Sequence, residues 1–240
     1  MTPFQVFIGY DSRETVAYHV LAESIRKHAS KPVSITPIVR EQLGPLFNRS
    51  RGPLEATDFA FTRFLVPYLA GYSGLALFLD CDMLCKADVW DLLLYPTAYP
   101  DKAIFVCQHD YVPKSSTKFL GQTQTVYPRK NWSSMMLFQA EKCKALTPRY
   151  VNEASGADLH RFVWLDDSDI GGLPLEWNWL VEEYPHNNDA KILHYTLGGP
   201  WFPETWECDH ASDWLEAWRS SMCLSRHEIA RLQDRIGAAQ

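Results

Sequence analysis

Residues 75–84 constrain this chain most, because an apolar run ends there in two aspartates that are one residue apart. The run 75–79 is apolar throughout, which indicates a buried strand. Asp80 and Asp82 place two like charges at its end, where they repel each other and lose solvation unless a divalent cation or several hydrogen bonds compensate them. If the strand persists through both, their side chains lie on one side of the backbone. We therefore expect a metal ion that also holds phosphate; the alternative is a pair that caps a helix or binds a loop.

Length, composition and charge limit the classes of protein. The chain has 240 residues, of which 46% are hydrophobic, so it can bury one sizeable core and we expect one domain. The formal net charge of -6 argues against a nucleic-acid partner, which would require a basic face. No run reaches the roughly 18 apolar residues that a spanning helix needs, and the first residues lack a secretion signal. The sequence thus predicts a cytoplasmic protein without a transmembrane segment and leaves its oligomeric state open.

The N-terminal part predicts a β-α-β unit. Residues 5–8 and 33–39 are expected strands, and between them Asp11 resembles the cap of a helix that follows it. Such units pair their strands in parallel, and 75–79 adds a further strand. The turn at 9–12 and the two aspartates should therefore share one edge of the sheet. The expected fold class is α/β, with a Rossmann-like, mostly parallel central sheet flanked by helices.

Further elements are expected along the rest of the chain. They are a helix over 57–68 capped by Thr57, strands at 103–107 and 134–138, a helix that begins at Thr147, and a C-terminal helix in which Trp214 and Trp218 pack.

A histidine far along the chain offers a third ligand to the aspartates. Residues 192–194 indicate a strand that runs into His194, and the glycine-rich turn at 197–200 has backbone amides placed to face phosphate. A lone histidine at a strand end is more often structural. Together with the two aspartates, in this order, it predicts a set of ligands for a divalent cation.

With these segments the chain resembles the family-8 glycosyltransferases, which have a GT-A fold. The matching segments cover most of residues 5–201: the opening at 7–11, Arg63 in the helix before the two aspartates, the motif at 79–84, the small-residue strand at 133–137 and the stretch from His194 to Trp201. The resemblance implies a transferase that uses a nucleotide-diphospho-sugar. Within one domain, we expect a nucleotide-binding half at 1–110, a half for the acceptor and donor sugar at 111–205, and a helical tail at 206–240.

The resemblance also implies roles for individual side chains. In that family the two aspartates and the histidine bind manganese, which bridges the diphosphate of the donor, so Asp80, Asp82 and His194 are expected to hold Mn²⁺ or Mg²⁺. An acidic segment lies beside the donor sugar in the family. By that match Asp166 or Asp167 is expected to be catalytic, either binding sugar hydroxyls or stabilising positive charge at the anomeric carbon.

Contacts with the nucleotide sugar are expected from several segments. The family's arginine near the donor maps onto Arg63. Tyr10 and Asp11, at the carboxyl edge of the first strand, are placed to stack on and hydrogen-bond a nucleobase, although a turn and a cap explain them equally well. The expected contacts are Gly9, Tyr10, Asp11, Arg63, Asp80, Cys81, Asp82, Ser134 and Gly199.

One position departs from the family's pattern. The family usually carries a lysine immediately before Pro-Trp, where it touches the diphosphate, and this chain has Gly199 there. The missing cation must come from Lys118, Arg129 or Lys130, or the backbone amides of the glycine turn must suffice.

The predicted function is that of a metal-dependent glycosyltransferase. It would transfer a sugar from a nucleotide-diphosphate donor, expected to be a UDP-sugar, to a hydroxyl of a glycan, a lipid-linked sugar or a protein, and the resemblance implies retention of anomeric configuration. One alternative is a haloacid-dehalogenase-like phosphohydrolase with Asp80 as nucleophile, although Leu84 stands where threonine or valine is usual. The other is a non-catalytic nucleotide-sugar or glycan-binding module, which the missing lysine favours.

Overall fold

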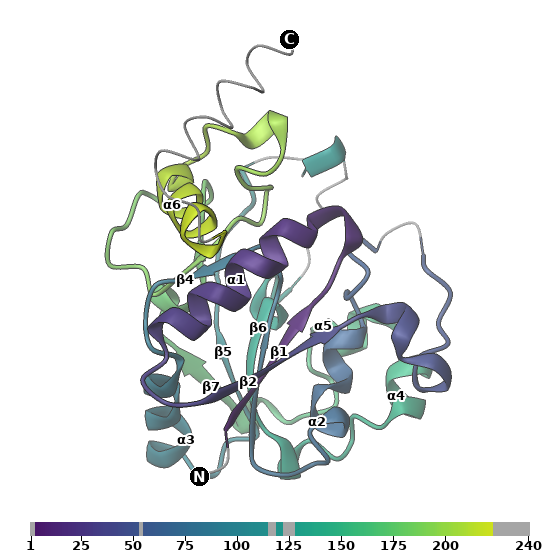
Figure 1. The fold of residues 1–240 in the computed structure, drawn as a ribbon. Helices are drawn as coiled ribbons and strands as arrows, with labels where there is room; N and C mark the ends of the chain where they lie inside the picture. The colour runs from purple at the N-terminus through teal and green to yellow at the C-terminus, as the bar shows by residue number, and fades with distance from the viewer. Residues whose placement is uncertain (1–2, 53–54, 115–118, 122–127, 223–240) are drawn as a thin grey trace.

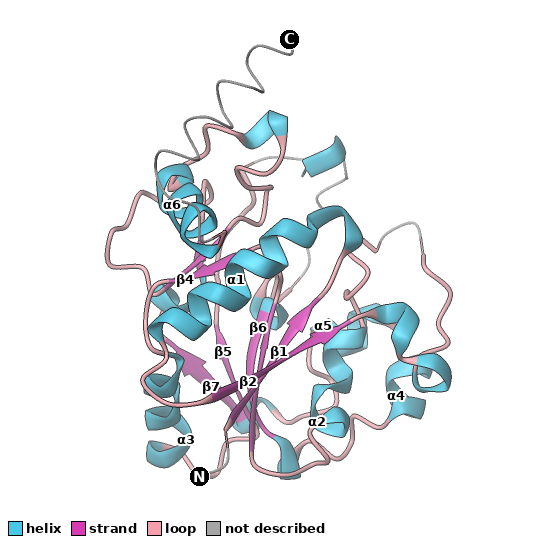
Figure 2. Ribbon diagram, viewed as in Figure 1, coloured by secondary structure: helices cyan, strands magenta, loops and turns pink. Residues whose placement is uncertain are grey.

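A six-stranded sheet forms the centre of the molecule. The structure is a computed structural model that describes residues 3–52, 55–114, 119–121 and 128–222. In spatial order, the strands are β2 (Val33–Ile38), β1 (Phe4–Gly9), β3 (Leu75–Leu79), β6 (Met135–Gln139), β5 (Ile104–Cys107) and β7 (Ile170–Leu173). β6 is antiparallel to both of its neighbours, and the other pairs are parallel. The prediction of a single α/β domain with a mostly parallel sheet is therefore confirmed (Figure 2).

A second, smaller sheet contains the strand that the sequence predicted before His194. It consists of β4 (Met83–Cys85), β9 (Ile192–His194) and β8 (Trp179–Leu180), with β9 in the middle. The chain leaves the main sheet after Leu79, where β3 ends, and enters the second sheet at Met83, where β4 begins. The two aspartates therefore lie in a turn between two sheets, and not on a strand that continues through them as the sequence analysis considered.

The helices lie around the two sheets. α1 (Thr15–His28) crosses the main sheet and packs against β4 and against α6 (Ala211–Ser221), which lies beside it in Figure 1. The shorter helices are α2 (Val66–Leu69), α3 (Leu94–Ala98), α4 (Pro148–Glu153) and α5 (Gly156–His160). In the ranges that the structure describes, no helix is long and apolar enough to span a membrane.

The helix predicted over 57–68 is shorter and tighter than expected. A 3-10 turn at Thr62–Leu65 leads into α2 at Val66, and Thr57 caps neither element. Pro67 explains the late start, because proline has no N–H to donate to the carbonyl four residues earlier and is tolerated only in the first turn of an α-helix.

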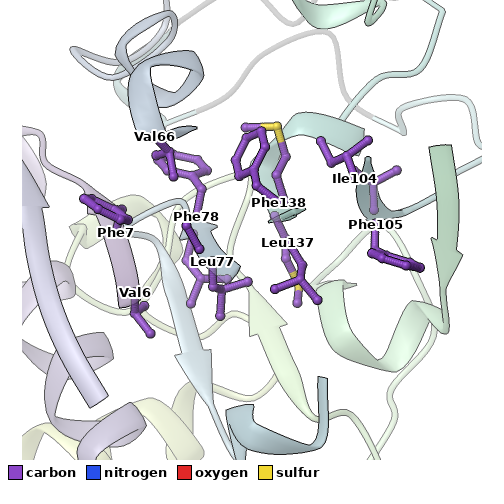
Figure 3. Close-up of a cluster of buried hydrophobic side chains, with 14 of the residues drawn as sticks. Val6, Phe7, Val66, Leu77, Phe78, Ile104, Phe105, Leu137 and Phe138 are labelled. Carbon is purple, nitrogen blue, oxygen red and sulfur yellow. The ribbon is translucent and has the colours of Figure 1, made fainter. Parts of the chain in front are cut away.

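The core fixes the strand ends that present the polar side chains. Figure 3 shows buried residues of β1, β3, β6 and β5 that pack side by side, with Phe7, Phe78, Phe138 and Phe105 among the largest. Each such ring contributes about 1.5–3 kcal/mol by burial. Leu79, the last residue of β3, is fully buried as well. The main chain that leads into the two aspartates is thus held on both sides by packed side chains.

Candidate functional site

Asp80, Asp82 and His194 form one compact group, which we call the aspartate cluster. Each offers one ligand atom, and these atoms all lie within 4.8 Å of one another. The three residues are only 8%, 6% and 2% exposed, respectively. Burial of two carboxylates beside an imidazole is costly unless a cation or hydrogen bonds offset it. The structure thus brings together the three residues that the resemblance marked as metal ligands.

Main-chain pairing creates this cluster from segments far apart in the sequence. β4 and β9 are antiparallel, and their register sets Met83 opposite His194. Tyr195 donates its backbone N–H to the carbonyl oxygen of Asp82 at 2.9 Å, which extends the ladder past the strand ends. Asp80 in turn donates its N–H to the Ser134 carbonyl oxygen at 3.0 Å. The backbones of both aspartates are therefore fixed before any ligand binds.

A buried asparagine sets the orientation of the His194 ring. The Nδ1–H of His194 donates to Asn178 Oδ1 at 2.9 Å, and Asn178 Nδ2 donates to Ser134 Oγ at 2.8 Å. The Ser134 hydroxyl in turn donates a hydrogen bond to the Asn131 carbonyl oxygen at 2.7 Å. With its proton on Nδ1, His194 has a lone pair on Nε2, which faces Asp82 Oδ1 at 3.3 Å. The sequence analysis missed Asn178. Its position between two tryptophans is the one signal in the sequence that distinguishes it.

The aspartate cluster fits a hard divalent cation. Asp82 Oδ1 is buried and has no hydrogen-bond partner within the described part of the chain, and it faces another acceptor, Nε2 of His194. Two acceptors in contact are accommodated by a cation between them. Bonds near 2.1 Å in an octahedral site set neighbouring ligand atoms about 3.0 Å apart, close to the 3.3 Å observed. Two carboxylates and one imidazole suit manganese or magnesium.

Arg63 lies directly against the aspartate cluster. Its Nη1 is 2.9 Å from Asp80 Oδ1 and also donates to the Ser133 carbonyl at 2.9 Å. The guanidinium is buried and lies 5.3 Å from the ring centre of Phe59 and 5.1 Å from that of Phe78. A buried guanidinium offers planar N–H donors that match the geometry of a carboxylate. Arg63 therefore orients Asp80 and adds positive charge to this edge of the sheet.

Glu14 is a buried carboxyl group beside the cluster that the sequence analysis did not select. It is fully buried, and its Oε2 lies 4.0 Å from the Cys81 thiol. Burial raises the pKa of Glu14 well above its usual range, and the charges of Asp82 and Asp11 raise it further. Glu14 thus adds a buried acidic group beside the two aspartates.

Cys81 separates the two aspartates and has no solvent-facing surface. Burial raises the pKa of its thiol well above the usual range, and the charge of Glu14 adds to this effect. The thiol is therefore inert as a nucleophile or a ligand near neutral pH. The Cys81 side chain packs inside the turn, and Asp80 and Asp82 on either side of it supply the polar groups.

His109 follows β5 at the same edge and was also missed. Its Nδ1 pairs with the Tyr184 hydroxyl at 2.8 Å. Burial, with a smaller contribution from the neighbouring His194, lowers the pKa of His109 to about 3. The imidazole is therefore uncharged beside the cluster at physiological pH.

The turn after β1 shares an edge with the aspartates, as predicted. β1 and β3 pair in parallel, with Ile8 opposite Leu79. Asp11 is fully buried and accepts from Arg13 Nε at 2.9 Å and from the Asp58 N–H at 3.1 Å. Burial would raise the pKa of Asp11, but the hydrogen bonds from Arg13 outweigh it and the pKa is lowered. Asp11 is thus a charged helix cap, as the sequence indicated.

Gly9 and Tyr10 have packing partners of their own at this edge. A Cβ on Gly9 would lie 2.4 Å from the Phe59 ring, so only glycine allows this close approach. The Tyr10 hydroxyl hydrogen-bonds Thr15 Oγ1 at 2.8 Å, and its ring meets the edge of Tyr18 at a centroid distance of 5.7 Å.

Gly199, which stands where the resembled family has a lysine, lies beneath an aromatic ring. A Cβ at this position would come within 2.1 Å of the Trp201 ring, so no side chain fits while the indole stays there. Of the cations considered instead, Arg129 pairs with Asp167 at 2.5 Å and Lys130 is buried. Lys118 lies outside the described residues.

The structure does not bring the predicted catalytic carboxylates to the aspartate cluster. Asp166 and Asp167 precede β7, which runs parallel to β5 and enters the sheet beside Ile104. β5 and β3 run in the same direction, since both are antiparallel to β6. The two residues therefore precede the amino end of a strand, whereas the aspartate cluster follows the carboxyl end. The Asp167 side chain is 81% exposed.

Solved structures with a similar fold are glycosyltransferases. The chain matches the WbbM bifunctional glycosyltransferase over 90% of its length (TM-score 0.63, 16% identity) and LgtC over 93% (TM-score 0.54, 12% identity). GlyE of Streptococcus pneumoniae TIGR4 matches over 92%, with a TM-score of 0.59 and 14% identity. The chain spans 50% of the WbbM chain, 62% of GlyE and 98% of LgtC. The fold is therefore the GT-A fold of glycosyltransferases, and the phosphohydrolase alternative loses its basis.

Sequence similarity identifies the family within this class. The chain is 48% identical over 223 residues to Protein CDI of Arabidopsis thaliana, which covers 89% of this chain and 85% of that protein. The chain belongs to the family of Protein CDI. It matches no protein-family model.

Proposed function

We propose that this protein is a metal-dependent glycosyltransferase, of the family-8 type, that transfers a sugar from a UDP-sugar to a hydroxyl acceptor with retention of configuration. The observation that carries the proposal is the aspartate cluster: a buried carboxylate oxygen without a hydrogen-bond partner in the described ranges and an imidazole lone pair that face each other at 3.3 Å. The fold supports it, since LgtC, a galactosyltransferase that shares this fold, has been solved with donor and acceptor sugar analogs.

Each side chain of the site has a proposed part in donor binding. Asp80, Asp82 and His194 hold Mn²⁺ or Mg²⁺, which when bound neutralises the diphosphate and stabilises it as a leaving group. Such a cation is needed because the whole chain carries a formal charge of -6 and would repel a nucleotide. Asn178 keeps the His194 lone pair directed at the cluster. Arg63 holds Asp80 in place and supplies positive charge that Gly199 cannot.

The remaining contacts to the donor come from backbone and packing positions. Gly9 and Tyr10 border the nucleobase at the carboxyl edge of β1, and Asp11 fixes the turn that carries them. Ser134 holds the main chain at Asp80 through its carbonyl oxygen, and the buried Cys81 packs the turn between the two aspartates. Asp166 and Asp167 have no part in the proposed site, because their strand enters from the opposite end of the sheet.

The acceptor is proposed to bind next to the glycine turn. A surface pocket there is lined by Trp201, Pro203, Glu204, Trp206 and Glu207. Trp206 is half exposed, and an exposed indole offers the apolar face on which a sugar ring stacks. A glycan or a lipid-linked sugar would meet this face, and a hydroxyl on a protein loop would reach the same pocket.

A calorimetric titration tests the proposal. UDP is titrated into the full chain with and without Mn²⁺, and into Asp82→Asn, which keeps the shape of the side chain and removes its charge. We expect tight binding only in the wild type with Mn²⁺. UDP binding that is equal with and without the metal and unaffected by Asp82→Asn would contradict the metal site.

A second assay separates an enzyme from the remaining alternative, a binding module. A panel of UDP-sugars is incubated with the protein and Mn²⁺, and released UDP is measured. The proposed enzyme releases UDP slowly from its own donor even without acceptor. A module that only binds saturates with a UDP-sugar and releases no UDP from any of them. The binding module is supported by one observation, namely that Gly199 stands where the resembled family has a lysine.

A further inference from the structure

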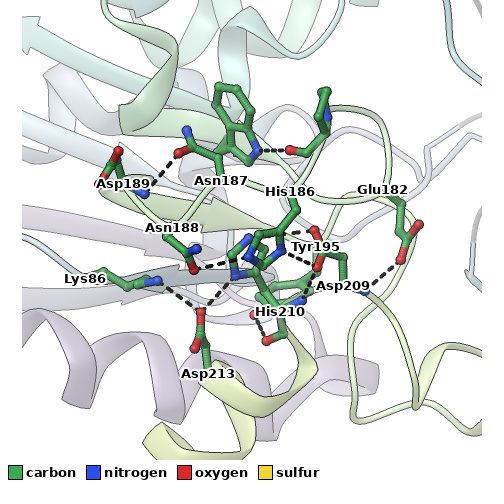
Figure 4. A network of polar contacts seen from close by, with 12 residues as sticks. Lys86, Glu182, His186, Asn187, Asn188, Asp189, Tyr195, Asp209, His210 and Asp213 are labelled. Carbon is green, nitrogen blue, oxygen red and sulfur yellow. Dashed lines mark hydrogen bonds and ion pairs between the residues drawn. The ribbon is translucent and has the colours of Figure 1, made fainter.

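A second group of metal-ligating side chains lies outside the aspartate cluster. His186, Asp209 and His210, which we call the histidine cluster, each offer one ligand atom, and these atoms all lie within 4.8 Å of one another. His186 belongs to the segment between β8 and β9, and His210 immediately precedes α6. Figure 4 shows the two imidazole rings against each other, with Asp209 and Asp213 around them. The rings are stacked at 4.2 Å with an interplanar angle of 10°.

His210 presents a buried lone pair. Its Nδ1–H donates to Asp213 Oδ2 at 2.8 Å, so Nε2 carries no proton in the neutral ring. Asp213 is itself held by Lys86, whose Nζ lies 3.0 Å from the same oxygen. His210 is only 5% exposed, and its Nε2 is buried without a hydrogen-bond partner in the described residues. That nitrogen lies 3.7 Å from Asp209 Oδ2.

His186 is oriented in the same manner from the solvent side. Its Nε2–H donates to Asn188 Oδ1 at 3.1 Å, and its Nδ1 faces Asp209 Oδ1 at 2.7 Å. Each histidine of the cluster thus has one ring nitrogen bound to an outer acceptor and the other directed at Asp209. Outer acceptors of this kind fix the ring and the tautomer of histidines that bind metals.

We propose that the histidine cluster is a zinc-binding site with Nδ1 of His186, Nε2 of His210 and the carboxylate of Asp209 as its ligands. Two imidazoles and one carboxylate are a donor set that zinc favours. Zinc bonds of about 2.0–2.1 Å in a tetrahedral site set ligand atoms about 3.3 Å apart, compared with 3.7 Å between His210 Nε2 and Asp209 Oδ2 and 2.7 Å between His186 Nδ1 and Asp209 Oδ1. Because the two rings are stacked, their lone pairs meet at one ion only when the exposed His186 ring turns away from that of His210. The side chain of His186 is 53% exposed, which leaves the fourth position open to water.

The location of the site gives it a structural consequence. The Tyr195 hydroxyl donates to the His210 carbonyl at 2.9 Å, and the Asp209 N–H donates to Glu182 Oε1 at 2.7 Å. Tyr195 directly follows His194 in the chain. A zinc ion here would link the start of α6 to the segment that leads into β9. It therefore braces the strand that carries His194, without taking part in the aspartate cluster.

Zinc binding to the full chain tests this inference. Protein stripped with a chelator is dialysed against Zn²⁺, bound zinc is counted by mass spectrometry, and the spectrum of a Co²⁺-substituted sample reports imidazole ligation. His186→Ala removes an exposed ligand that the fold does not need. His19→Ala, at an exposed histidine outside the cluster, is the matched control, and Asp82→Asn removes the other candidate site.

The expected result is loss of one zinc equivalent, or at least a tenfold weaker affinity, in His186→Ala, with no change in His19→Ala. Asp82→Asn should retain this equivalent. Zn²⁺ should also raise the melting temperature of the wild type and not that of His186→Ala. A zinc stoichiometry and affinity that His186→Ala leaves unchanged, or loss of the same equivalent in Asp82→Asn, would overturn the inference. The proposed transferase activity does not enter these measurements, so its failure would leave the zinc result standing.

Discussion

The aspartate cluster and the histidine cluster each bring three possible metal ligands together, but different interactions hold those ligands in place. In the aspartate cluster, main-chain pairing between β4 and β9 sets the distance between Asp82 and His194. In the histidine cluster, side-chain hydrogen bonds to Asn188 and Asp213 hold the two imidazole rings in place. The first is buried and the second is partly open to solvent. Backbone pairing therefore positions the aspartate cluster, whereas the histidine cluster depends on individual side chains.

The comparison also separates the metals that each cluster suits. Two carboxylates with one imidazole favour a hard cation, and two imidazoles with one carboxylate favour zinc. The acceptor that orients each histidine differs too: Asn178 is neutral, whereas Asp213 is charged. A charged acceptor raises the basicity of the imidazole and hence its affinity for zinc.

The largest effect is expected at Asp82. Asp82→Asn removes one negative ligand of the proposed manganese site, and we expect kcat/KM for glycosyl transfer to fall by about 1,000-fold, or about 4 kcal/mol of transition-state stabilisation. His186→Ala, in the histidine cluster, should leave transfer within about twofold of the wild type. Initial rates of UDP release at saturating Mn²⁺ measure both. Equal losses in the two variants would show that the clusters act as one site.

The pH dependence of stability should distinguish buried from exposed histidines. Burial, with smaller contributions from the nearby Arg63 and Arg49, lowers the pKa of His160 to about 3. In the unfolded state His160 takes up a proton as pH falls below about 6.5, whereas in the folded state it stays neutral until about pH 3. The free energy of unfolding therefore decreases as pH falls from 6.5 toward 3. The loss approaches about 1.4 kcal/mol per pH unit for this one residue. The pKa of His186 is instead raised, chiefly by its hydrogen bond to Asp209, so its contribution has the opposite sign.

Urea unfolding at pH 6.5 and 5.0 measures this difference. In His160→Gln the decline of unfolding free energy between these two pH values should be smaller than in the wild type by about 1.4 kcal/mol per pH unit. His186→Gln serves as the control and should not flatten the decline. A wild-type slope that His160→Gln leaves unchanged would contradict a neutral, buried His160.

The outer acceptors should differ in importance. Asn178→Ala leaves His194 Nδ1 and Ser134 Oγ without their partner in a buried place, and we expect Mn²⁺ affinity to fall about 10–100-fold. Stability should fall by about 1–3 kcal/mol as well. Asn188→Ala exposes His186 Nε2 to water, which replaces the lost carbonyl, so zinc affinity should fall only about threefold. Calorimetric titration with each metal measures both, and a larger loss in Asn188→Ala would reverse the ranking of the two supports.

The smallest effect is expected at Asp167. Its ion pair with Arg129 is largely exposed, so Asp167→Asn should change unfolding free energy by less than about 0.5 kcal/mol. Because the residue lies before the amino end of β7, transfer should stay within about twofold. A loss of activity beyond tenfold would restore the catalytic role that the family resemblance implied.

The sequence was sufficient for those parts of the fold that local patterns define. Apolar runs gave the strands that became β1, β2, β3, β5 and β6, and Asp11 and Thr147 were recognised as helix caps. The cap at Thr57 was wrong, because Pro67 delays the α-helix to Val66. Strand β4 was missed since three residues after a polar turn carry no periodicity.

The site residues likewise divide into those that local sequence patterns predict and those that they do not. Asp80, Asp82 and His194 were recognisable because their residue types and order match a family pattern. Glu14 and Asn178 were not, because each is a single polar residue whose inward position depends on contacts with segments far along the chain. The place of Asp167 in the fold was not predictable for the opposite reason, since an acidic run has a recognisable composition but no direction. The antiparallel β6 decides which end of the sheet it approaches.

The sequence alone determined the class of fold, the chemical nature of the aspartate cluster and the absence of the expected lysine at Gly199. Only the tertiary structure decided that Asp82 and His194 meet at 3.3 Å, that Asn178 directs the imidazole, and that Trp201 excludes any side chain at position 199. It also decided that His186 and His210 stack around Asp209. The physical reason is that composition and periodicity are local properties of a chain, whereas distances between ligands arise from strand register and packing between distant segments.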